Sequence, residues 1–347
     1  MPKDEKKRQK ILVTGSAGFI GGYLIQELLE QGHEVVGIDN FSKYGRVEKS
    51  YDSHPCYEFH QGDVKNINLL KELLEDCDYL VAGAAMVGGI TYFHKFAYDL
   101  LAENERIIAS TFDAAINAYK HCKLKKIIVL SSSMVFESTT IFPTSEKAVF
   151  SSPPPISTYG FQKLACEYFA RGAWEQYGLP YTIVRPFNCV GIGEKQTKTE
   201  VKVKSGNIKL SMSHVVPDLI QKVLKGQSPL HILGDGRQIR CYTYGGDLAR
   251  GIVLAIFSDK AKNEDFNLST DEQTTVLELA EKIWKKINKD RPFRYISDEP
   301  FKYDVQKRVP DTAKAKKVLG FKARTTLDKM LGEVIPWIKK QIEFSAI

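Results

Sequence analysis

The stretch Thr14-Gly15-Ser16-Ala17-Gly18-Phe19-Ile20-Gly21 decides the fold of this chain of 347 residues. It follows a short apolar run at residues 11–14, which is typical of a buried parallel strand, and it leads into apolar residues at helical spacing over 19–31. Glycine permits a tight turn here and lets the backbone approach a pyrophosphate closely. The free N–H groups at the start of the following helix favour an anion. Strand, glycine loop and helix together predict a dinucleotide-binding unit.

Strands and helices alternate downstream of this loop. Strands are predicted at residues 34–38, 57–59, 79–82, 126–130 and 181–185, and helices between them at 68–75, 100–121 and 159–177. Such alternation indicates an α/β fold built on a doubly wound parallel sheet of the Rossmann type. The predicted dinucleotide-binding domain covers residues 1–187 and is joined by about 231–265.

The pattern changes after Pro186. Residues 193–214 are polar and rich in lysine, and we interpret them as a loop that serves as a lid or an insertion. The later apolar patterns are mostly helical and lie at residues 215–225, 247–257, 275–287 and 327–342. We expect a smaller, mostly helical C-terminal lobe for the substrate, formed by residues 188–230 and 266–347.

Composition and charge limit the class of protein. A hydrophobic fraction of 43% is sufficient for a sizeable core, and the net charge of +7 suits small anionic ligands as well as nucleic acid or a membrane surface. We assign most lysines to the solvated surface and expect neither a nucleic-acid partner nor a membrane association. No apolar run reaches the roughly 18 residues of a membrane span, and the basic N-terminus lacks the apolar core of a signal peptide.

The six cysteines show no C-x-x-C spacing. This argues against a zinc site or a redox pair, so no bound metal is expected. Scattered reduced thiols are usual in cytoplasmic proteins, and we therefore expect a cytoplasmic location.

Two acidic residues follow strands near the glycine loop. Asp39 ends the second strand, about 20 residues beyond the loop, where a carboxylate binds both ribose hydroxyls of NAD and repels the 2′-phosphate of NADP. This position predicts NAD as the cofactor; the alternative is a turn aspartate before Asn40. Asp63 follows Gly62 and the third strand, so it either lies near the adenine or caps the next helix.

A tyrosine and a lysine lie four residues apart on one face of the predicted helix at 159–177, namely Tyr159 and Lys163. A tyrosine has an ordinary pKa of about 10 and is a poor base at neutral pH, but a neighbouring ammonium favours the phenolate. Ser131-Ser132-Ser133 places hydroxyls at the carboxyl end of a strand, where open α/β sheets bind ligands. Y-x-x-x-K alone occurs by chance in many helices, so only the combination indicates a catalytic site.

These motifs, taken in order, resemble the extended short-chain dehydrogenases. More narrowly, they resemble the NAD-dependent epimerase/dehydratase group that acts on nucleotide-sugars. Further segments carry the resemblance, which spans roughly residues 10–335: R-P-F-N at 185–188, G-D-G-R-Q-I-R at 234–240, K-R-V-P-D at 307–311 and A-K-K-V-L-G at 315–320.

The resemblance implies roles for the site residues. Tyr159 would take a proton from a sugar hydroxyl while hydride moves to NAD, and Lys163 would bind the nicotinamide ribose. Ser132 would hydrogen-bond the reacting hydroxyl, with Ser133 as the alternative, and Asn104 resembles a structural asparagine of the family. Besides Asp39, Asp63 and these residues, the expected NAD contacts are Gly15, Ala17, Gly18, Phe19, Ile20, Gly21, Asn40, Val64, Ala84 and Ala85.

The nucleotide-sugar would be bound mainly through its diphosphate. By the same resemblance, Asn188, Arg240 and Arg308 would hold the two phosphates, because the arginine fork matches phosphate oxygens. Met134 and Val216 complete the expected substrate contacts.

The sequence departs from two patterns of the family. Sugar 4,6-dehydratases carry an Asp-Glu pair where this chain has Ser133-Met134, and nucleotide-glucuronate decarboxylases usually keep the Glu. Methionine is no acid or base, so both reactions are disfavoured. The segments 84–90 and 213–217 resemble GDP-fucose synthases, in which the His that corresponds to His214 is a catalytic acid, but this chain has Met134 where those enzymes have Cys. His214 is therefore either a second acid/base or a polar residue at a helix start.

The sequence thus predicts an NAD-dependent nucleotide-sugar epimerase that oxidises C4 of the sugar to a transient 4-keto intermediate, or a 4-dehydrogenase. The alternatives are a dehydratase or a GDP-4-keto-sugar epimerase/reductase that uses His214 as the extra acid/base. A non-catalytic NAD-binding relative is disfavoured by the intact Ser-Tyr-Lys set. The resemblance also implies a homodimer formed through the helices at 100–121 and 159–177.

Overall fold

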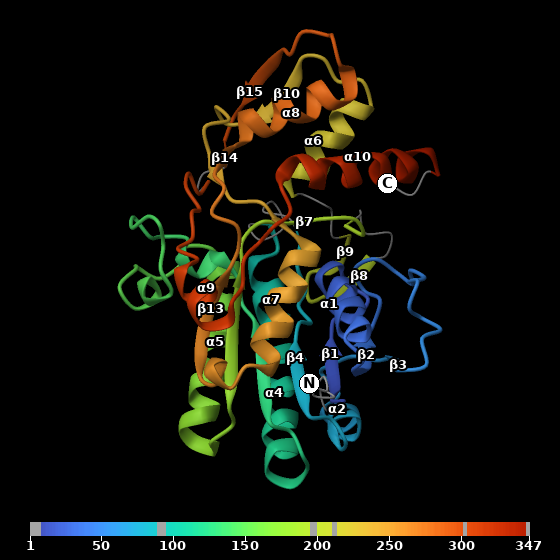
Figure 1. Ribbon diagram of the computed structural model, residues 1–347, viewed down its shortest axis with the longest axis vertical. Helices are drawn as coiled ribbons and strands as arrows, with labels where there is room; N and C mark the ends of the chain where they lie inside the picture. Colours follow the sequence, from blue (N-terminus) through green and yellow to red (C-terminus); the bar gives the residue numbers. More distant parts are fainter. Residues whose placement is uncertain (1–7, 89–94, 195–199, 210–213, 301–303, 345–347) are drawn as a thin grey trace, which may run out of the picture.

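A seven-stranded parallel sheet is the centre of the computed structural model, which describes residues 8–88, 95–194, 200–209, 214–300 and 304–344 (Figure 1). The strand order is β13-β6-β5-β4-β1-β2-β3. The bounds are β1 Lys10–Thr14, β2 Glu34–Asp39, β3 Tyr57–Gln61, β4 Tyr79–Ala82, β5 Lys126–Leu130, β6 Tyr181–Pro186 and β13 Glu264–Leu268. The order reverses at β1, as it does in doubly wound sheets, and the predicted Rossmann-type α/β fold is confirmed.

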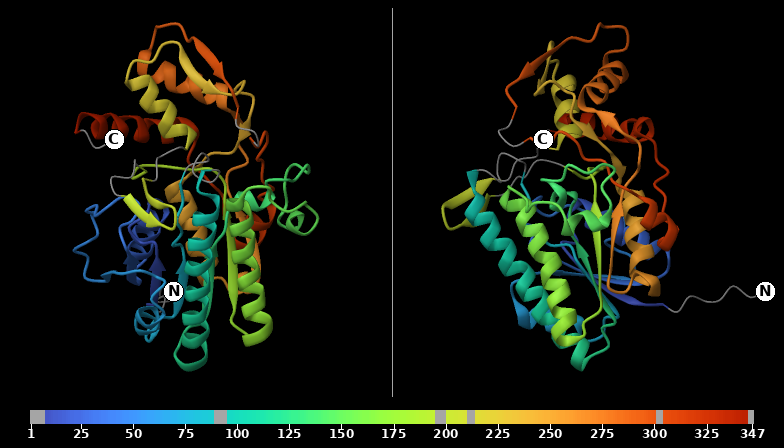
Figure 2. Two further views of the ribbon diagram at one scale, coloured as in Figure 1. Left: turned by 180° about the vertical axis from the view of Figure 1, so that it is seen from behind. Right: turned by 90° about the vertical axis from the view of Figure 1, so that its left-hand side faces the viewer.

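Helices cover both faces of this sheet (Figure 2). One layer is formed by α2 (Ile67–Leu74), α4 (Ala97–His121) and α5 (Thr158–Tyr177), and the other by α1 (Phe19–Glu30), α7 (Gly245–Phe257) and α9 (Ala313–Leu319). Three short 3₁₀ segments lie in the connections: η1 (Ser133–Phe136) and η2 (Glu146–Phe150) between β5 and α5, and η3 (Asp259–Ala261) between α7 and β13. The central strands β1, β4, β5 and β6 are therefore buried on both sides, which explains their near-continuous apolar residues.

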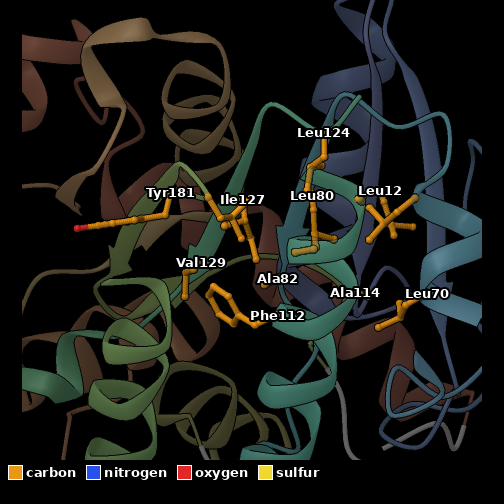
Figure 3. Close-up of a cluster of buried hydrophobic side chains, with 14 of the residues drawn as sticks. Leu12, Leu70, Leu80, Ala82, Phe112, Ala114, Leu124, Ile127, Val129 and Tyr181 are labelled. Carbon is orange, nitrogen blue, oxygen red and sulfur yellow. The ribbon is translucent and has the colours of Figure 1, made fainter. Parts of the chain in front are cut away.

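Alternation along the strands divides the core into two halves. Leu12 points to the layer of α2, α4 and α5, whereas its neighbours Ile11 and Val13 point to α1 and α7. Figure 3 shows the first half, in which Leu12, Leu80 and Ile127 pack with Phe112 of α4. Each such fully buried side chain stabilises the fold by about 1.5–3 kcal/mol.

A second lobe lies beyond the carboxyl ends of the strands (Figures 1 and 2). Its core is formed by α6 (Val215–Leu224), α8 (Val276–Asn288) and α10 (Leu327–Glu343), with the parallel pair β10 (Leu230–Leu233) and β15 (Tyr295–Asp298). Helix α8 begins at a capping box in which Thr275 and Glu278 bond to each other's backbone N–H. Two small strand pairs connect the lobes: β7 (Cys189–Val190) with β12 (Thr243–Tyr244), and β11 (Ile239–Arg240) with β14 (Thr274–Thr275).

The structure corrects the expectation of a loop at 193–214. A two-stranded antiparallel hairpin, β8 (Glu200–Val203) and β9 (Gly206–Lys209), lies inside this segment. Its tip is attached to the start of α4, because Val203 packs against Leu100 and Ser205 donates both its N–H and its hydroxyl to Asp99. The polar composition concealed the alternating valines of Glu200-Val-Lys-Val.

Two segments pack outside the limits that the sequence predicted for the lobes. Ile232 of β10 belongs to the core of the second lobe, although it falls in the joining segment that was expected from about residue 231. Ala315 and Leu319 of α9 pack against the sheet, although they fall in 266–347. The predicted limits of the two lobes, and the assignment of NAD to one and of the substrate to the other, stay predictions. Within the described ranges no helix has the length and apolar composition needed to cross a membrane.

The glycine loop generates a prediction about stability. A Cβ at Gly21 would lie 2.4 Å from the carbonyl oxygen of Gly15, whereas a Cβ at Gly332, on the exposed side of α10, meets no described atom within 4 Å. We expect Gly21→Ala to lower the free energy of unfolding by about 1–3 kcal/mol. Gly332→Ala should raise it by roughly 0.5–1 kcal/mol, because alanine favours the helix.

Urea denaturation of both variants measures these changes. Equal effects of the two substitutions would show that the Gly15–Gly21 contact places no steric limit on the loop.

Candidate active site

A pocket lies above the carboxyl ends of the central strands. It is lined by the glycine loop, the ends of β2 and β3, the β4–α4 connection, the serines after β5, and the start of α5. The predicted site residues that line it are Gly15, Gly18, Phe19, Ile20, Gly21, Asp39, Asn40, Asp63, Val64, Ala84, Ala85, Ser132, Ser133, Met134, Tyr159, Lys163, Asn188, His214 and Arg308. Of the predicted site residues, all of which the structure describes, Ala17, Asn104, Val216 and Arg240 do not line it.

The glycine loop is held against the end of β4. The Thr14 hydroxyl oxygen accepts hydrogen bonds from the N–H groups of Gly83 and Ala84 at 3.0 and 3.1 Å. Gly15 has φ of +72°, and a Cβ there would lie 2.9 Å from the Cα of Ala84. Glycine is therefore required for the turn and for the close approach of the two loops.

Asp39 is fixed at the carboxyl end of β2. Its carboxylate accepts hydrogen bonds from the N–H of Phe41 at 2.7 Å and from the N–H of Ala17 at 3.1 Å. Burial raises the pKa of Asp39, and these two bonds oppose the increase. Ala17 contributes its N–H to Asp39, which explains why it does not line the pocket itself.

Asn104 of α4 lies behind the pocket wall. Its side-chain amide accepts from the N–H of Met86 at 2.7 Å and donates to the carbonyl of Met86 at 3.0 Å. This pair of bonds fixes the backbone after Ala84 and Ala85, so Asn104 shapes the pocket from outside. Gly89 and Ile90, which end the 84–90 motif, lie outside the described residues.

The Tyr-Lys pair lies at the start of α5. The Lys163 ammonium donates to the carbonyl of Leu130 at 2.8 Å, which leaves its other N–H groups for the pocket. Tyr159 packs near Leu100 and Val203, below the tip of the β8–β9 hairpin. The Ser132 hydroxyl oxygen accepts from the N–H of Met134 at 3.2 Å and caps η1.

The helix start that carries Tyr159 is tied to η1. The N–H and the hydroxyl of Ser157 both donate to the carboxylate of Glu137, at 2.9 and 2.8 Å, and the Ser157 oxygen accepts from the N–H of Gly160 at 3.0 Å. These contacts fix the spacing between the serine segment and Tyr159. Sequence reasoning did not identify Glu137, because it lies at the end of the serine motif and 20 residues from its partner.

The two predicted diphosphate arginines differ in placement. Arg308 lines the pocket, and burial lowers the pKa of its guanidinium, which the neighbouring Arg240 lowers further. Arg240 donates to the carbonyl of Ile239 at 3.0 Å and contacts Asp304 at 3.5 Å. Two adjacent guanidinium groups attract an anion.

The remaining predicted substrate residues are also divided. The Asn188 amide donates to the carbonyl of Cys241 at 3.3 Å at the edge of the pocket. The Val216 side chain lies in the core of the second lobe and is 1% exposed. Val216 is the second residue of the predicted helix, and the sequence alone does not show whether its side chain faces the pocket or the core.

His214 has a partner that sequence reasoning missed. Its Nδ1 contacts the carboxylate of Glu194, which is 4% exposed and also lines the pocket. Glu194 belongs to a polar segment without a motif, so nothing in the sequence indicated the pairing. In the part of the chain that the structure describes, no three His, Cys, Asp or Glu side chains are grouped to hold a metal ion.

The fold and this constellation define an extended short-chain dehydrogenase. Residues 11–269 match the NAD dependent epimerase/dehydratase family, and the chain belongs to this family. It is therefore an enzyme of a family that uses NAD, and the predictions of the family, of an enzyme and of the family's cofactor are confirmed.

Relatives of the chain act on nucleotide-sugars. It is 29% identical over 332 residues to a putative UDP-glucose 4-epimerase of Methanocaldococcus jannaschii, with 95% of this chain and 98% of the relative covered. It is 27% identical over 340 residues to a UDP-N-acetyl-alpha-D-glucosaminuronate decarboxylase of Bacillus cytotoxicus, with 96% and 98% covered. It is also similar to the solved structure of a UDP-glucuronic acid 4-epimerase from Bacillus cereus in complex with UDP-glucuronic acid and NAD, with a TM-score of 0.79, 27% identity, and 95% and 99% covered.

The position of Asp39 generates a prediction about the cofactor. NAD should bind much more tightly than NADP, because the buried carboxylate repels a 2′-phosphate. Asp39→Ala should narrow the gap by about tenfold or more, the value of one charge-assisted contact.

Calorimetric titration with both dinucleotides measures the gap. The control is Glu48→Ala, an exposed residue in the connection between β2 and β3, which should leave the ratio of the NAD and NADP affinities unchanged. Equal affinities of the wild-type protein for NAD and NADP would contradict the assignment of Asp39.

Proposed function

We propose that this chain is an NAD-dependent 4-epimerase of a nucleotide-sugar, most simply a UDP-sugar. It oxidises the C4 hydroxyl to a transient 4-keto group and reduces the ketone from the other face. The observation that carries this proposal is the convergence of Ser132, Tyr159 and Lys163 with the glycine loop in one pocket. The UDP-sugar 4-epimerases among its relatives support the choice of substrate.

The pocket fits NAD. Gly15, Gly18 and Gly21 line the pocket at the start of α1, where the backbone suits a pyrophosphate, and the Asp39 carboxylate suits the adenosine ribose. Val64 and Asp63 would lie beside the adenine, and Lys163 would bind the nicotinamide ribose. When bound, NAD supplies the acceptor of the C4 hydride.

Three side chains then carry the proton chemistry. Tyr159 takes the proton of the C4 hydroxyl as general base, and the Lys163 ammonium stabilises its phenolate. Ser132 donates a hydrogen bond to the C4 oxygen. After the 4-keto sugar has turned about its bond to the diphosphate, Tyr159 returns the proton to the same oxygen.

The diphosphate is held at the border of the two lobes. Arg308 and Asn188 line the pocket, and Arg240 is a neighbour of Arg308. Val216 contributes to the wall only through the placement of α6. Because these groups bind the phosphates rather than the sugar, the sugar ring can turn while the nucleotide remains bound.

The second candidate is an enzyme with an extra acid: a dehydratase or a GDP-4-keto-sugar epimerase/reductase. Its support is the placement of His214 in the pocket with Glu194 on its Nδ1, because a carboxylate at one ring nitrogen orients the imidazole. Met134, beside Ser133, offers no acid for water elimination, which favours the first candidate.

We also propose a cytoplasmic homodimer that binds no nucleic acid. Exposed aromatic side chains on α4 and α5 support the subunit contact, among them Tyr98 (63% exposed), Phe161 (49%) and Tyr168 (62%). Six free cysteines support a reducing compartment. The two-lobe division remains part of the proposal, with NAD bound mainly by the sheet domain and the nucleotide-sugar mainly by the second lobe.

The mechanism predicts the effects of two substitutions. Tyr159→Phe should lower turnover about 10²–10⁴-fold, because the phenyl ring cannot take the proton. His214→Ala should retain hydride transfer at C4.

Mass spectrometry after reaction in deuterated water distinguishes the candidates. A 4-epimerase returns the same hydride, so its product carries no carbon-bound deuterium and has lost no water. Deuterium at C3 or C5, or a dehydrated product that vanishes in His214→Ala, would instead support the second candidate.

The diphosphate contacts predict a selective change in the Michaelis constant. Arg308→Ala should raise KM for the nucleotide-sugar by about tenfold or more and change kcat less, because one charged contact is worth about 1.5–3 kcal/mol. Arg240→Ala should act in the same direction, and Arg237→Ala, an 87% exposed side chain, is the control.

Steady-state kinetics measure both constants. If KM is unchanged in Arg308→Ala and in Arg240→Ala, the substrate is placed wrongly.

A further inference from the structure

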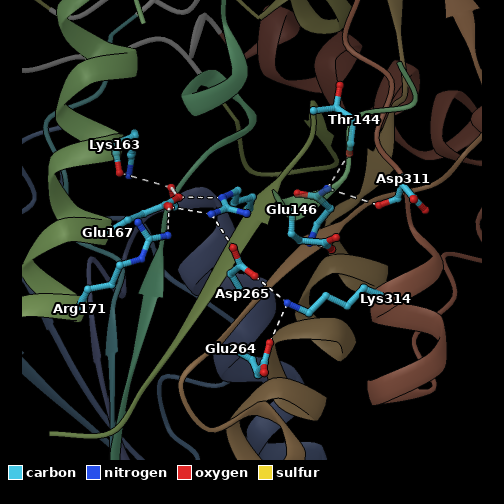
Figure 4. Close-up of polar contacts among 12 residues, drawn as sticks. Thr144, Glu146, Lys163, Glu167, Arg171, Glu264, Asp265, Asp311 and Lys314 are labelled. Carbon is cyan, nitrogen blue, oxygen red and sulfur yellow. Dashed lines mark hydrogen bonds and ion pairs between the residues drawn. The ribbon is translucent and has the colours of Figure 1, made fainter. Parts of the chain in front are cut away.

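A chain of charged side chains, fully buried at Glu167 and Arg185, lies close to Lys163 (Figure 4). Glu167 of α5 and Arg185 of β6 are both 0% exposed and form two parallel hydrogen bonds, each of 2.7 Å. Arg185 also contacts Asp265 of β13 at 2.8 Å, and Asp265 accepts from Lys314 of α9 at 2.7 Å. The chain thus runs from the catalytic helix to the edge strand of the sheet and a helix near the C-terminus.

The charges in this chain are maintained by one another. Burial would raise the pKa of the Asp265 carboxyl, but the Arg185 guanidinium and the Lys314 ammonium outweigh it and hold that pKa below its usual range. Burial would lower the pKa of the Arg185 guanidinium, but the Glu167 and Asp265 carboxylates outweigh it and raise that pKa. Asp265, Arg185 and Lys314 therefore stay ionised at neutral pH.

One bond connects this chain to the active site. The Ser131 hydroxyl donates to Glu167 at 2.6 Å, and both groups are buried. Ser131 stands between Leu130, whose carbonyl accepts from Lys163, and Ser132. Tyr159, Lys163 and Glu167 occupy positions i, i+4 and i+8 of α5, so they share one face of the helix. The bonds from Lys163 to Leu130 and from Ser131 to Glu167 thus join the end of β5 to this face, and the Ser131 hydroxyl also lies 3.4 Å from the carbonyl oxygen of Lys163.

Stability alone does not account for such an arrangement. A buried ion pair costs much of its own attraction in lost hydration, and a well-packed apolar pair of the same volume often stabilises a fold as well. What charged groups provide is a fixed geometry, because bidentate arginine–carboxylate contacts allow one orientation. Because the Arg185 contacts hold the Glu167 carboxylate in one orientation, they also fix the position of the Ser131 hydroxyl that donates to it.

We propose that Glu167 is a positioning residue for the catalytic set, acting through Ser131. Arg185, Asp265 and Lys314 hold the Glu167 carboxylate, the carboxylate holds Ser131, and Ser131 sets the place of Ser132 and of the Leu130 carbonyl that orients Lys163. This inference rests on the proposed function, since its effect is on hydride transfer at the sugar.

The clearest test is Ser131→Ala, because it removes the connecting bond and leaves every charge paired. Glu167→Gln keeps the size of the side chain and removes its charge, while Arg185 keeps Asp265 as a partner. The control is Thr182→Val at the other end of β6, which removes a buried hydroxyl that donates to the carbonyl of Ala261 at 2.6 Å.

Both site variants should lower kcat about tenfold, because small displacements of reacting groups slow the chemical step. Their KM for the UDP-sugar should stay within about twofold, because the diphosphate contacts are remote. The rate of the first hydride transfer, followed by the absorbance of the reduced nicotinamide in a single turnover, should fall with kcat. Thr182→Val should lower the thermal midpoint without lowering kcat.

Two results would overturn the inference. One is a Ser131→Ala enzyme that behaves as the control does, with a lower thermal midpoint and an unchanged kcat; this variant decides even if Glu167→Gln does not fold. The other is an unchanged affinity for NAD in Ser131→Ala. It is needed if the wild-type protein turns over no UDP-sugar, because the proposed function then fails independently of the positioning role. NAD affinity then decides: a displaced Lys163 should weaken NAD binding in Ser131→Ala, and an unchanged dissociation constant would refute the positioning role.

Discussion

The close approach of the glycine loop to the end of β4 is the constraint on which the rest of the site depends. The Thr14 hydroxyl bonds the backbone of Gly83 and Ala84, and Gly15 and Gly21 supply the room that this contact needs. Parallel strands end at one edge of a sheet, so segments that are distant in the sequence bring their polar ends together there. The contact leaves backbone N–H groups at the start of α1 directed at the space where an anion fits.

The elements that the sequence predicted well are those whose pattern is local. The strands at β1 and β5 are uninterrupted apolar runs, and the helices of the first half repeat their apolar residues at helical spacing. The strand β13 was missed because it begins with Glu264 and Asp265, charges that β6 and α9 neutralise only in the folded chain. Helix α9 was missed because it has only seven residues and three of them are lysines, which leaves a weak apolar pattern. Neither signal exists until the partners are in place.

The same distinction holds for the site. Asp39 and the Tyr159–Lys163 pair could be proposed as site residues from the combination of motifs, and the structure places all three in the pocket. Glu194 and Glu167 could not, because their partners lie 20 and 18 residues away on other elements. Arg240 shows a further limit: its motif identifies a cation near the diphosphate, but the side chain contacts Asp304 and lies beside the pocket rather than in its wall.

One fold can serve several reactions in this family because oxidation at C4 is common to them and only the next step differs. In the proposed mechanism the groups for this oxidation lie after β5 and on α5, which the bond from Ser131 to Glu167 joins. The group for a second step has to come from the positions beside Ser132 or from the second lobe. At the first place this chain has Met134, which is 6% exposed and has no proton to give. At the second it has His214, whose side chain is 58% exposed and whose Nδ1 is already engaged by Glu194. A further reaction at another carbon of the sugar would therefore need His214 to act through its other ring nitrogen, Nε2. Return of the hydride to C4, as we propose it, needs only Ser132, Tyr159 and Lys163.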